Sequence, residues 1–161
     1  MSTQRLIVHV SDAKVSSNPA DVLITYSLGS CIGICLYDPT VQVGGMLHYQ
    51  LPESRIDVEK AKANPFMFAD TGMDLLIRKL ISMGATTKRM EVRLAGGATM
   101  SGSPQGFQIG KRNHLAIRKI IWQHRLFIKG EDVGGGSARN LYLNLSDGQV
   151  VVKSNGRERV L

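Results

Sequence analysis

Both cysteines of this 161-residue chain lie in one short apolar stretch, LGSCIGICLYDP. Cys31 follows directly after a Gly29-Ser30 turn, and Cys35 comes four residues later. If residues 31–37 form a strand, the two cysteines share a face and lie about 13 Å apart, too far for a disulfide, which needs Cα atoms within about 7 Å. A zinc site needs roughly four ligands, and no Cys-x-x-Cys or His-x-x-His pair is present. Packing in the core and nucleophilic catalysis therefore remain as the two interpretations.

The turn before Cys31 favours a reactive thiol at that position alone. A nucleophilic thiol needs a base and oriented hydrogen-bond donors. Backbone N–H groups in the turn, at Gly29 and Ser30, are candidate donors to an oxyanion. Cys35 lies deeper in the expected strand and lacks such a turn, so we interpret it as a packing residue. Because free cysteines are most often buried small hydrophobes, packing stays the alternative for Cys31 as well.

His48 is the best candidate for the base. A hairpin that turns about Pro39-Thr40 pairs residues whose numbers sum to 79, which places His48 opposite Cys31 with Cβ atoms about 4.5–5.5 Å apart. Proline suits the favoured two-residue turns poorly, and Gly44-Gly45 offers a site for a bulge that would slip the register. The hydroxyl of Thr25 is a candidate to orient the imidazole, although threonine is also simply common in strands.

The rest of the sequence predicts the elements that must position these residues. Alternating or β-branched segments predict strands, and apolar residues at helical spacing predict two helices. One helix follows Asn64-Pro65 and ends at Gly84, the other covers residues 110–126, and the charged stretch 52–65 is expected to be an exposed loop. The expected strands are residues 5–10, 21–26, 31–37, 43–51, 89–97, 126–130, 139–145 and 149–153. Strands interrupted by two helices predict a layered α/β domain spanning residues 1–161.

Composition narrows the class of protein further. Hydrophobic residues make up 43% of the chain, enough for a core without disulfides, and the formal charge of +7 favours an acidic partner. No apolar run approaches the ~20 residues that span a bilayer, and no signal peptide is recognisable, so a cytoplasmic protein is expected. Aromatic residues make up only 6% and are not interleaved with the basic ones, which disfavours nucleic-acid binding.

A set of ordered motifs resembles the CheD family of chemoreceptor glutamine deamidases. The set covers about residues 5–155 and comprises Leu28-Gly29-Ser30-Cys31, Tyr37-Asp38-Pro39, Gly44-Gly45-Met46-Leu47-His48, Leu51-Pro52, Phe68-Ala69-Asp70, Gly96-Gly97-Ala98, Ile109-Gly110-Lys111-Arg112-Asn113, Asp132-Val133-Gly134-Gly135 and Arg139. Any one glycine motif is weak evidence, whereas the ordered set is strong. Ser27 and Phe68 stand where glycine and tyrosine are common in the family, which affects only local loop shape and substrate fit.

The resemblance implies a role for each candidate residue. Cys31 would be the nucleophile, His48 the general base and Thr25 the orienting hydroxyl. The fold would be a three-layer α/β/β sandwich similar to the catalytic domain of cytotoxic necrotising toxins. The implied reaction converts glutamine side chains of methyl-accepting chemotaxis receptors to glutamate with release of ammonia. It requires no metal or organic cofactor, and a CheC-type chemotaxis phosphatase is the implied regulatory partner.

Two further functions fit the same residues. One is a CheD-like protein that docks to receptors or phosphatase with little turnover, and the intact Cys31, His48 and Thr25 argue against that alternative. A methylesterase acting on glutamyl methyl esters would use the same thiol chemistry, since an ester is cleaved more easily than an amide.

The paired glycines at 96–97 and 134–135 lack the spacing of phosphate-binding loops and are expected to form tight turns, with Arg139 pairing with Asp70 or Asp132 nearby.

Overall fold

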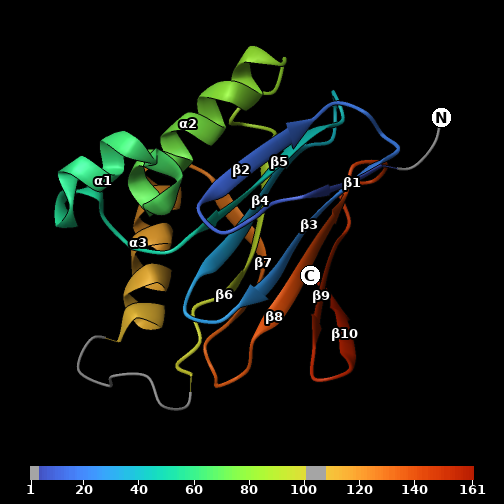
Figure 1. Cartoon of the computed structure of the whole chain (residues 1–161). Coiled ribbons are helices and arrows are strands. Elements are labelled where there is room, and N and C mark those ends of the chain that lie inside the picture. Colours follow the sequence, from blue (N-terminus) through green and yellow to red (C-terminus); the bar gives the residue numbers. More distant parts are fainter. Residues whose placement is uncertain (1–3, 101–107) are drawn as a thin grey trace.

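The computed structural model describes residues 4–100 and 108–161, which form two β-sheets and a layer of helices (Figure 1). The strands are β1 (Gln4–Ile7), β2 (Asp12–Ser16), β3 (Asp21–Leu28), β4 (Ile32–Asp38), β5 (Val43–Tyr49), β6 (Glu91–Gly96), β7 (Phe127–Val133), β8 (Arg139–Asn144), β9 (Val150–Ser154) and β10 (Arg157–Val160). The helices are α1 (Val58–Ala63), α2 (Ala69–Ser82) and α3 (Ile109–Gln123), with short 3₁₀ turns η1 (Ser54–Ile56) and η2 (Pro65–Met67). None of the helices in these two ranges is long and apolar enough to cross a membrane.

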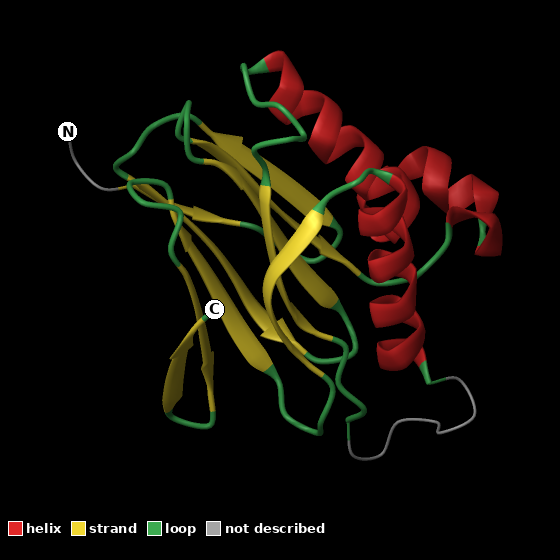
Figure 2. Cartoon of the chain, turned by 180° about the vertical axis from the view of Figure 1, so that it is seen from behind, coloured by secondary structure: helices red, strands yellow, loops and turns green. Residues whose placement is uncertain are grey.

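The two sheets and the helices stack as three layers. One sheet has the strand order β1-β3-β8-β9-β10 and the other β2-β5-β4-β6-β7. The helices pack on the second sheet, and Figure 2 shows that the first sheet lies on the side away from them. The expected three-layer α/β/β sandwich is therefore confirmed.

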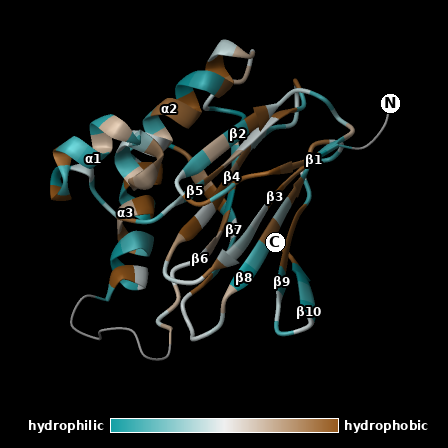
Figure 3. Ribbon diagram, viewed as in Figure 1, coloured by the Kyte–Doolittle hydropathy of each residue, from teal (hydrophilic) through white to brown (hydrophobic). Residues whose placement is uncertain are grey.

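Two hydrophobic cores hold the layers together, and β4 contributes to both. Alternate side chains of a strand point to opposite faces. Ile32, Ile34 and Leu36 pack in the core between the middle sheet and the helices, whereas Cys35 and Tyr37 pack between the sheets. All seven residues of β4 are buried, as expected for a strand with both faces covered. Figure 3 shows hydrophobic colouring on strands of both sheets and on parts of the helices.

The β4–β5 hairpin has a different register from the predicted one. Ile32 pairs with Tyr49 and Gly33 with His48, so paired numbers sum to 81 instead of 79. The loop holds four residues, 39–42, because the Asp38 carboxylate accepts a hydrogen bond from Thr40 N at 3.0 Å and closes an Asx turn. The prediction that Cys31 lies directly opposite His48 is therefore wrong, but an even shift keeps His48 on the same face.

Several other elements differ from the prediction. The stretch 52–65 is not a plain loop, because Asp57 caps helix α1 through a hydrogen bond from Lys60 N. Asn64 caps the 3₁₀ turn η2, and α2 begins only at Ala69. The edge strands β2 and β10 were not predicted, since short polar edge strands carry little hydrophobic pattern. The remaining predicted strands and helix 110–126 are present with shifted ends.

Asp38 also anchors the far end of β4, which predicts a stability effect. Its side chain is fully buried, and burial alone would raise its pKa, but hydrogen bonds from Arg89, Thr86 N and Thr40 N outweigh burial and lower the pKa. We expect Arg89→Ala to reduce the free energy of unfolding by about 2 kcal/mol, below the 3–5 kcal/mol of a fully buried pair, because Arg89 is partly exposed and both backbone donors remain.

Urea unfolding checks this expectation at two pH values. A carboxyl with a lowered pKa stabilises the fold above its unfolded pKa of about 3.9, so the Arg89→Ala effect should shrink as the pH falls through the lowered value. Arg78→Ala is the matched control, because Arg78 forms an exposed ion pair with Asp74 that should contribute less than about 0.5 kcal/mol. Equal effects of the two substitutions would contradict the role of Asp38.

Candidate active site

Cys31 lies immediately before β4, in a turn whose carbonyl groups are fixed by the neighbouring strand end. Gly97 N donates to Cys31 O at 2.9 Å, and Ala98 N donates to Gly29 O at 2.9 Å. A side chain at Gly96, where φ is +119°, would collide with the Cys31 carbonyl, which explains the need for glycine there. The tight turn predicted at 96–97 is not formed: Gly96 is the last residue of β6 and Gly97 follows it, both with positive φ. Their contact is with the turn that carries the thiol.

The N–H groups of this turn belong to a partly exposed segment, residues 29–31. Within residues 4–100 and 108–161, the N–H groups of Gly29, Ser30 and Cys31 donate to no backbone carbonyl. In a trans peptide the C=O and N–H point in opposite directions, so the bond from Ala98 N to Gly29 O turns the Ser30 N–H away from Ala98. Among the described residues, the predicted oxyanion donors at Gly29 and Ser30 are thus without a backbone partner, and so is the Cys31 N–H.

His48 and Thr25 meet between the two sheets. Thr25 Oγ1 lies 2.7 Å from His48 Nδ1 and donates to Val8 O, also at 2.7 Å. A hydroxyl has a single proton, so Thr25 must accept a hydrogen bond from Nδ1–H of the imidazole. The network therefore assigns the tautomer that leaves the lone pair on His48 Nε2. Thr25 is fully buried and His48 is 1% exposed, so the ring has little freedom to turn.

Cys31 and His48 are diagonal neighbours across β4 and β5. Gly33 lies opposite His48, and Cys31 is two residues from Gly33 on the same face. Diagonal neighbours are about 7–8 Å apart at Cα and less at Cβ. Among the described residues His48 Nε2 has no hydrogen-bond partner, so the thiol does not bond to it in this structure. Nε2 is thus a buried acceptor left free on the face that carries Cys31.

Burial keeps both groups neutral. It raises the pKa of the Cys31 thiol, an effect that the residue's own backbone N–H opposes, and it lowers the pKa of His48 to about 4. At neutral pH the pair is therefore thiol and imidazole, not thiolate and imidazolium. A neutral imidazole can accept the thiol proton as the sulfur attacks, which is general-base chemistry.

The second cysteine behaves as a core residue. Cys35 is 1% exposed and packs in the core between the sheets. Burial raises the pKa of its thiol far above the ordinary value. Both cysteines are free, as the spacing predicted. Cys31 is partly exposed and so differs from Cys35 in access to a substrate.

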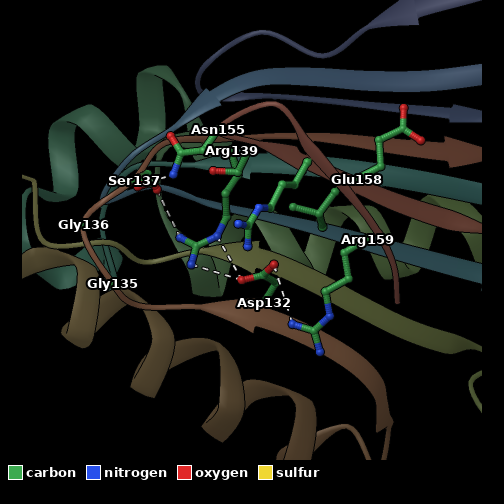
Figure 4. Close-up of a pocket in the computed structure, with 11 residues that line it drawn as sticks. Asp132, Gly135, Gly136, Ser137, Arg139, Asn155, Glu158 and Arg159 are labelled. Atoms are coloured by element: carbon green, nitrogen blue, oxygen red, sulfur yellow. Dashed lines mark hydrogen bonds and ion pairs between the residues drawn. The ribbon is translucent and has the colours of Figure 1, made fainter.

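Arg139 supports the glycine pairs from the neighbouring sheet. It donates to Asp132 at 3.1 Å, to Gly134 O at 2.7 Å and to Gly96 O at 3.3 Å, while Asp70 instead binds Ser54. Figure 4 shows the guanidinium lying between Asp132 and the chain at Ser137, along a pocket of about 700 Å³. Neither Cys31 nor His48 lines that pocket, so the thiol does not lie in it.

Two contributors to the site could not be identified from their residue types. The Val8 carbonyl, which sets the direction of the Thr25 hydroxyl, is a backbone group without any sequence signal. Asn113 lies in a quoted motif, but its contact with the thiol turn depends on how α3 packs: its side-chain amide donates to Ser30 O at 2.9 Å and to Gln50 O at 2.8 Å.

A partly exposed thiol near a free imidazole nitrogen, with unpaired N–H donors in the same turn, is the arrangement that thiol hydrolases use. The described residues bring groups of these three kinds to one end of β4 and β5. Sequence comparison then identifies the family: the chain belongs to the CheD family, whose model, described as CheD chemotactic sensory transduction, matches residues 50–154.

Full-length relatives agree with that family. A Syntrophus aciditrophicus protein named probable chemoreceptor glutamine deamidase CheD 1 is 48% identical over 151 residues, which cover 94% of each chain. A Solibacter usitatus protein named probable chemoreceptor glutamine deamidase CheD is 44% identical over 98% of this chain and 94% of its own. A Neisseria meningitidis protein of the DUF152 family aligns at 11% identity with a TM-score of 0.43, over 83% of this chain and 63% of its own.

Proposed function

We propose that this protein is a chemoreceptor glutamine deamidase with Cys31 as nucleophile, His48 as general base and Thr25 as the residue that orients the base. One observation carries the proposal: the 2.7 Å contact between Thr25 and His48 Nδ1 leaves Nε2 as a free acceptor on the face of the sheet that bears Cys31. The names of the CheD relatives supply the substrate class, which is the glutamine side chains of chemoreceptors.

The first half-reaction forms a thioester. The Cys31 thiol proton passes to His48 Nε2 while Sγ attacks the carbonyl carbon of the glutamine side chain. The carbonyl oxygen becomes an oxyanion, and the N–H groups of Ser30, Cys31 and Gly29 are its proposed donors. The tetrahedral intermediate collapses as His48 returns the proton to the nitrogen, so the C–N bond breaks and ammonia leaves.

The second half-reaction regenerates the thiol. Water attacks the thioester carbon and gives a proton to His48 Nε2, and the C–S bond breaks as His48 returns this proton to the sulfur. The net change is glutamine plus water to glutamate plus ammonia. Every proton transfer uses the same imidazole nitrogen, so the chain's own residues suffice for the sequence of steps.

The charge of the protein suits an acidic substrate. The formal net charge is +7, and complementary charge accelerates encounter more than it tightens binding. Receptor methylation segments, which the family resemblance implies as the substrate, are acidic. A CheC-type chemotaxis phosphatase as regulatory partner remains a prediction from the same resemblance.

Mass spectrometry of receptor cytoplasmic fragments tests the proposed function. We expect the protein to convert specific glutamines to glutamate, seen as the mass increase from replacing an amide NH₂ by OH, with release of ammonia. Fragments carrying glutamyl methyl esters are the comparison, because methanol release without ammonia release would identify a methylesterase instead. Tight binding of the fragments with neither product would identify a docking regulator.

A further inference from the structure

The side chain of Asn113 joins the two segments that carry the proposed nucleophile and base. Asn113 lies in the first turns of α3 and is fully buried. Its amide nitrogen donates to Ser30 O, one residue before Cys31, and to Gln50 O, two residues after His48. Both partners are carbonyl acceptors, so the NH₂ group must face them and the orientation of the amide is unambiguous.

The bond to Ser30 O determines the direction of the Cys31 N–H. Ser30 C=O and Cys31 N–H belong to one peptide plane and point in opposite directions. Because Asn113 holds the carbonyl toward α3, the N–H points away from α3. On either side of the Ser30 carbonyl, the Gly29 carbonyl accepts a hydrogen bond from Ala98 N and the Cys31 carbonyl accepts one from Gly97 N. The three bonds together fix successive peptide planes of the thiol turn.

The carbonyl oxygen of the Asn113 side chain indicates that fold stability alone does not explain why an asparagine is buried here. Among the described residues, Asn113 Oδ1 is buried without a hydrogen-bond partner. An unpaired buried acceptor is destabilising. A polar side chain is therefore kept inside the helix layer for the sake of its two donors, and both of these reach the segments around the site.

We propose that Asn113 is a positioning residue that orients the Ser30–Cys31 peptide so that the Cys31 N–H can stabilise an oxyanion. The inference rests on the proposed role of Cys31 as nucleophile. Its signature is selective: losing Asn113 should impair reactions in which Cys31 adds to a carbonyl and spare those in which the sulfur reacts without forming an oxyanion.

Two small reagents separate these cases without a receptor. p-Nitrophenyl acetate acylates the thiol: the S–C bond forms through a tetrahedral oxyanion, the ester C–O bond breaks and p-nitrophenol leaves. Iodoacetamide alkylates the same sulfur by displacing iodide, and no carbonyl addition occurs. We expect Asn113→Ala to lower the ratio of the acylation rate to the alkylation rate by about 10²-fold, the typical effect of losing one oxyanion donor. Cys31→Ala identifies the part of each signal that comes from Cys31.

Matched variants separate positioning from a general loss of structure. Tyr49→Phe removes the 2.7 Å hydrogen bond to the Asn113 backbone carbonyl but leaves the Asn113 side chain in place. This variant should therefore keep the wild-type ratio of acylation rate to alkylation rate. Asn113→Ser, which retains one donor on a shorter side chain, serves if the alanine variant does not fold, and it should lower the ratio less.

The outcomes also distinguish this inference from the proposed function. Equal changes in both rates, no change in either, or no Cys31-dependent acylation of the wild type would overturn the positioning role. A selective fall in acylation, together with no conversion of receptor glutamines, would support the role of Asn113 while the deamidase assignment fails.

Discussion

Replacing Cys31 by alanine will abolish glutamine conversion in receptor fragments and leave receptor binding intact. The substitution removes the only atom proposed to form a covalent bond with substrate, and loss of a nucleophile costs up to about 10⁶-fold in turnover. It removes one sulfur from a partly exposed position, so the fold should be unaffected. Ammonia release and mass spectrometry measure turnover, and co-sedimentation with receptor fragments measures binding.

The other cysteine supplies the control. Cys35→Ala also removes one sulfur, but from the core between the sheets, where the side chain is 1% exposed. We expect a lower melting temperature and a normal rate per folded molecule. If Cys35→Ala abolished turnover while Cys31→Ala retained it, the assignment of the nucleophile would be wrong.

Local features of the sequence were enough to separate these two cysteines. The alternation in residues 31–37 predicted which side chains share a face, and the observed partition of Ile34 and Cys35 between the two cores confirms it. The Gly-Ser turn before Cys31 predicted a thiol at a strand end. Both inferences depend on residues that are adjacent in the chain, where backbone geometry leaves few alternatives.

The register of the β4–β5 hairpin was not predictable in the same way. The turn was expected to centre on Pro39-Thr40, but the buried Asp38 carboxylate binds Thr40 N, Thr86 N and Arg89, which produces a four-residue loop. Arg89 lies far along the chain, so its effect on this turn has no local signal. The face of His48 was still predicted correctly, because an even shift of register preserves the side-chain alternation.

Contacts between layers account for what else the sequence did not reveal. Asn113 reaches the thiol turn only because α3 packs beside the ends of β4 and β5, and Val8 reaches Thr25 only because β1 leads into a segment beside β3. In each case a backbone carbonyl is one partner, and backbone carbonyls are present at every residue. Residue type therefore carries no information about which carbonyl is used.

Replacing His48 by glutamine will lower kcat/KM by about 10²–10⁴-fold, the usual contribution of a general base. A glutamine amide can still donate to Thr25 and fill much of the space, so the substitution removes proton transfer and little else. Thr25→Val should cause a smaller fall, because it frees the imidazole to adopt the other tautomer, and Thr25→Ser should restore the rate by returning the hydroxyl. Steady-state kinetics on one receptor fragment compares the variants.

The pH dependence tests the state of His48 more directly than substitution does. Burial lowers the pKa of His48 to about 4, and a base works only in its neutral form, so activity should be lost only as the pH falls toward that value. We expect kcat/KM to stay level between about pH 8 and about pH 5, whereas an ordinary imidazole would titrate near 6.5. The raised pKa of Cys31 leads to the same expectation, because proton transfer then accompanies attack and no preformed thiolate is needed. An acid limb centred near 6.5 would instead mean that His48 is hydrated when substrate binds, and that the thiol reacts from an ion pair.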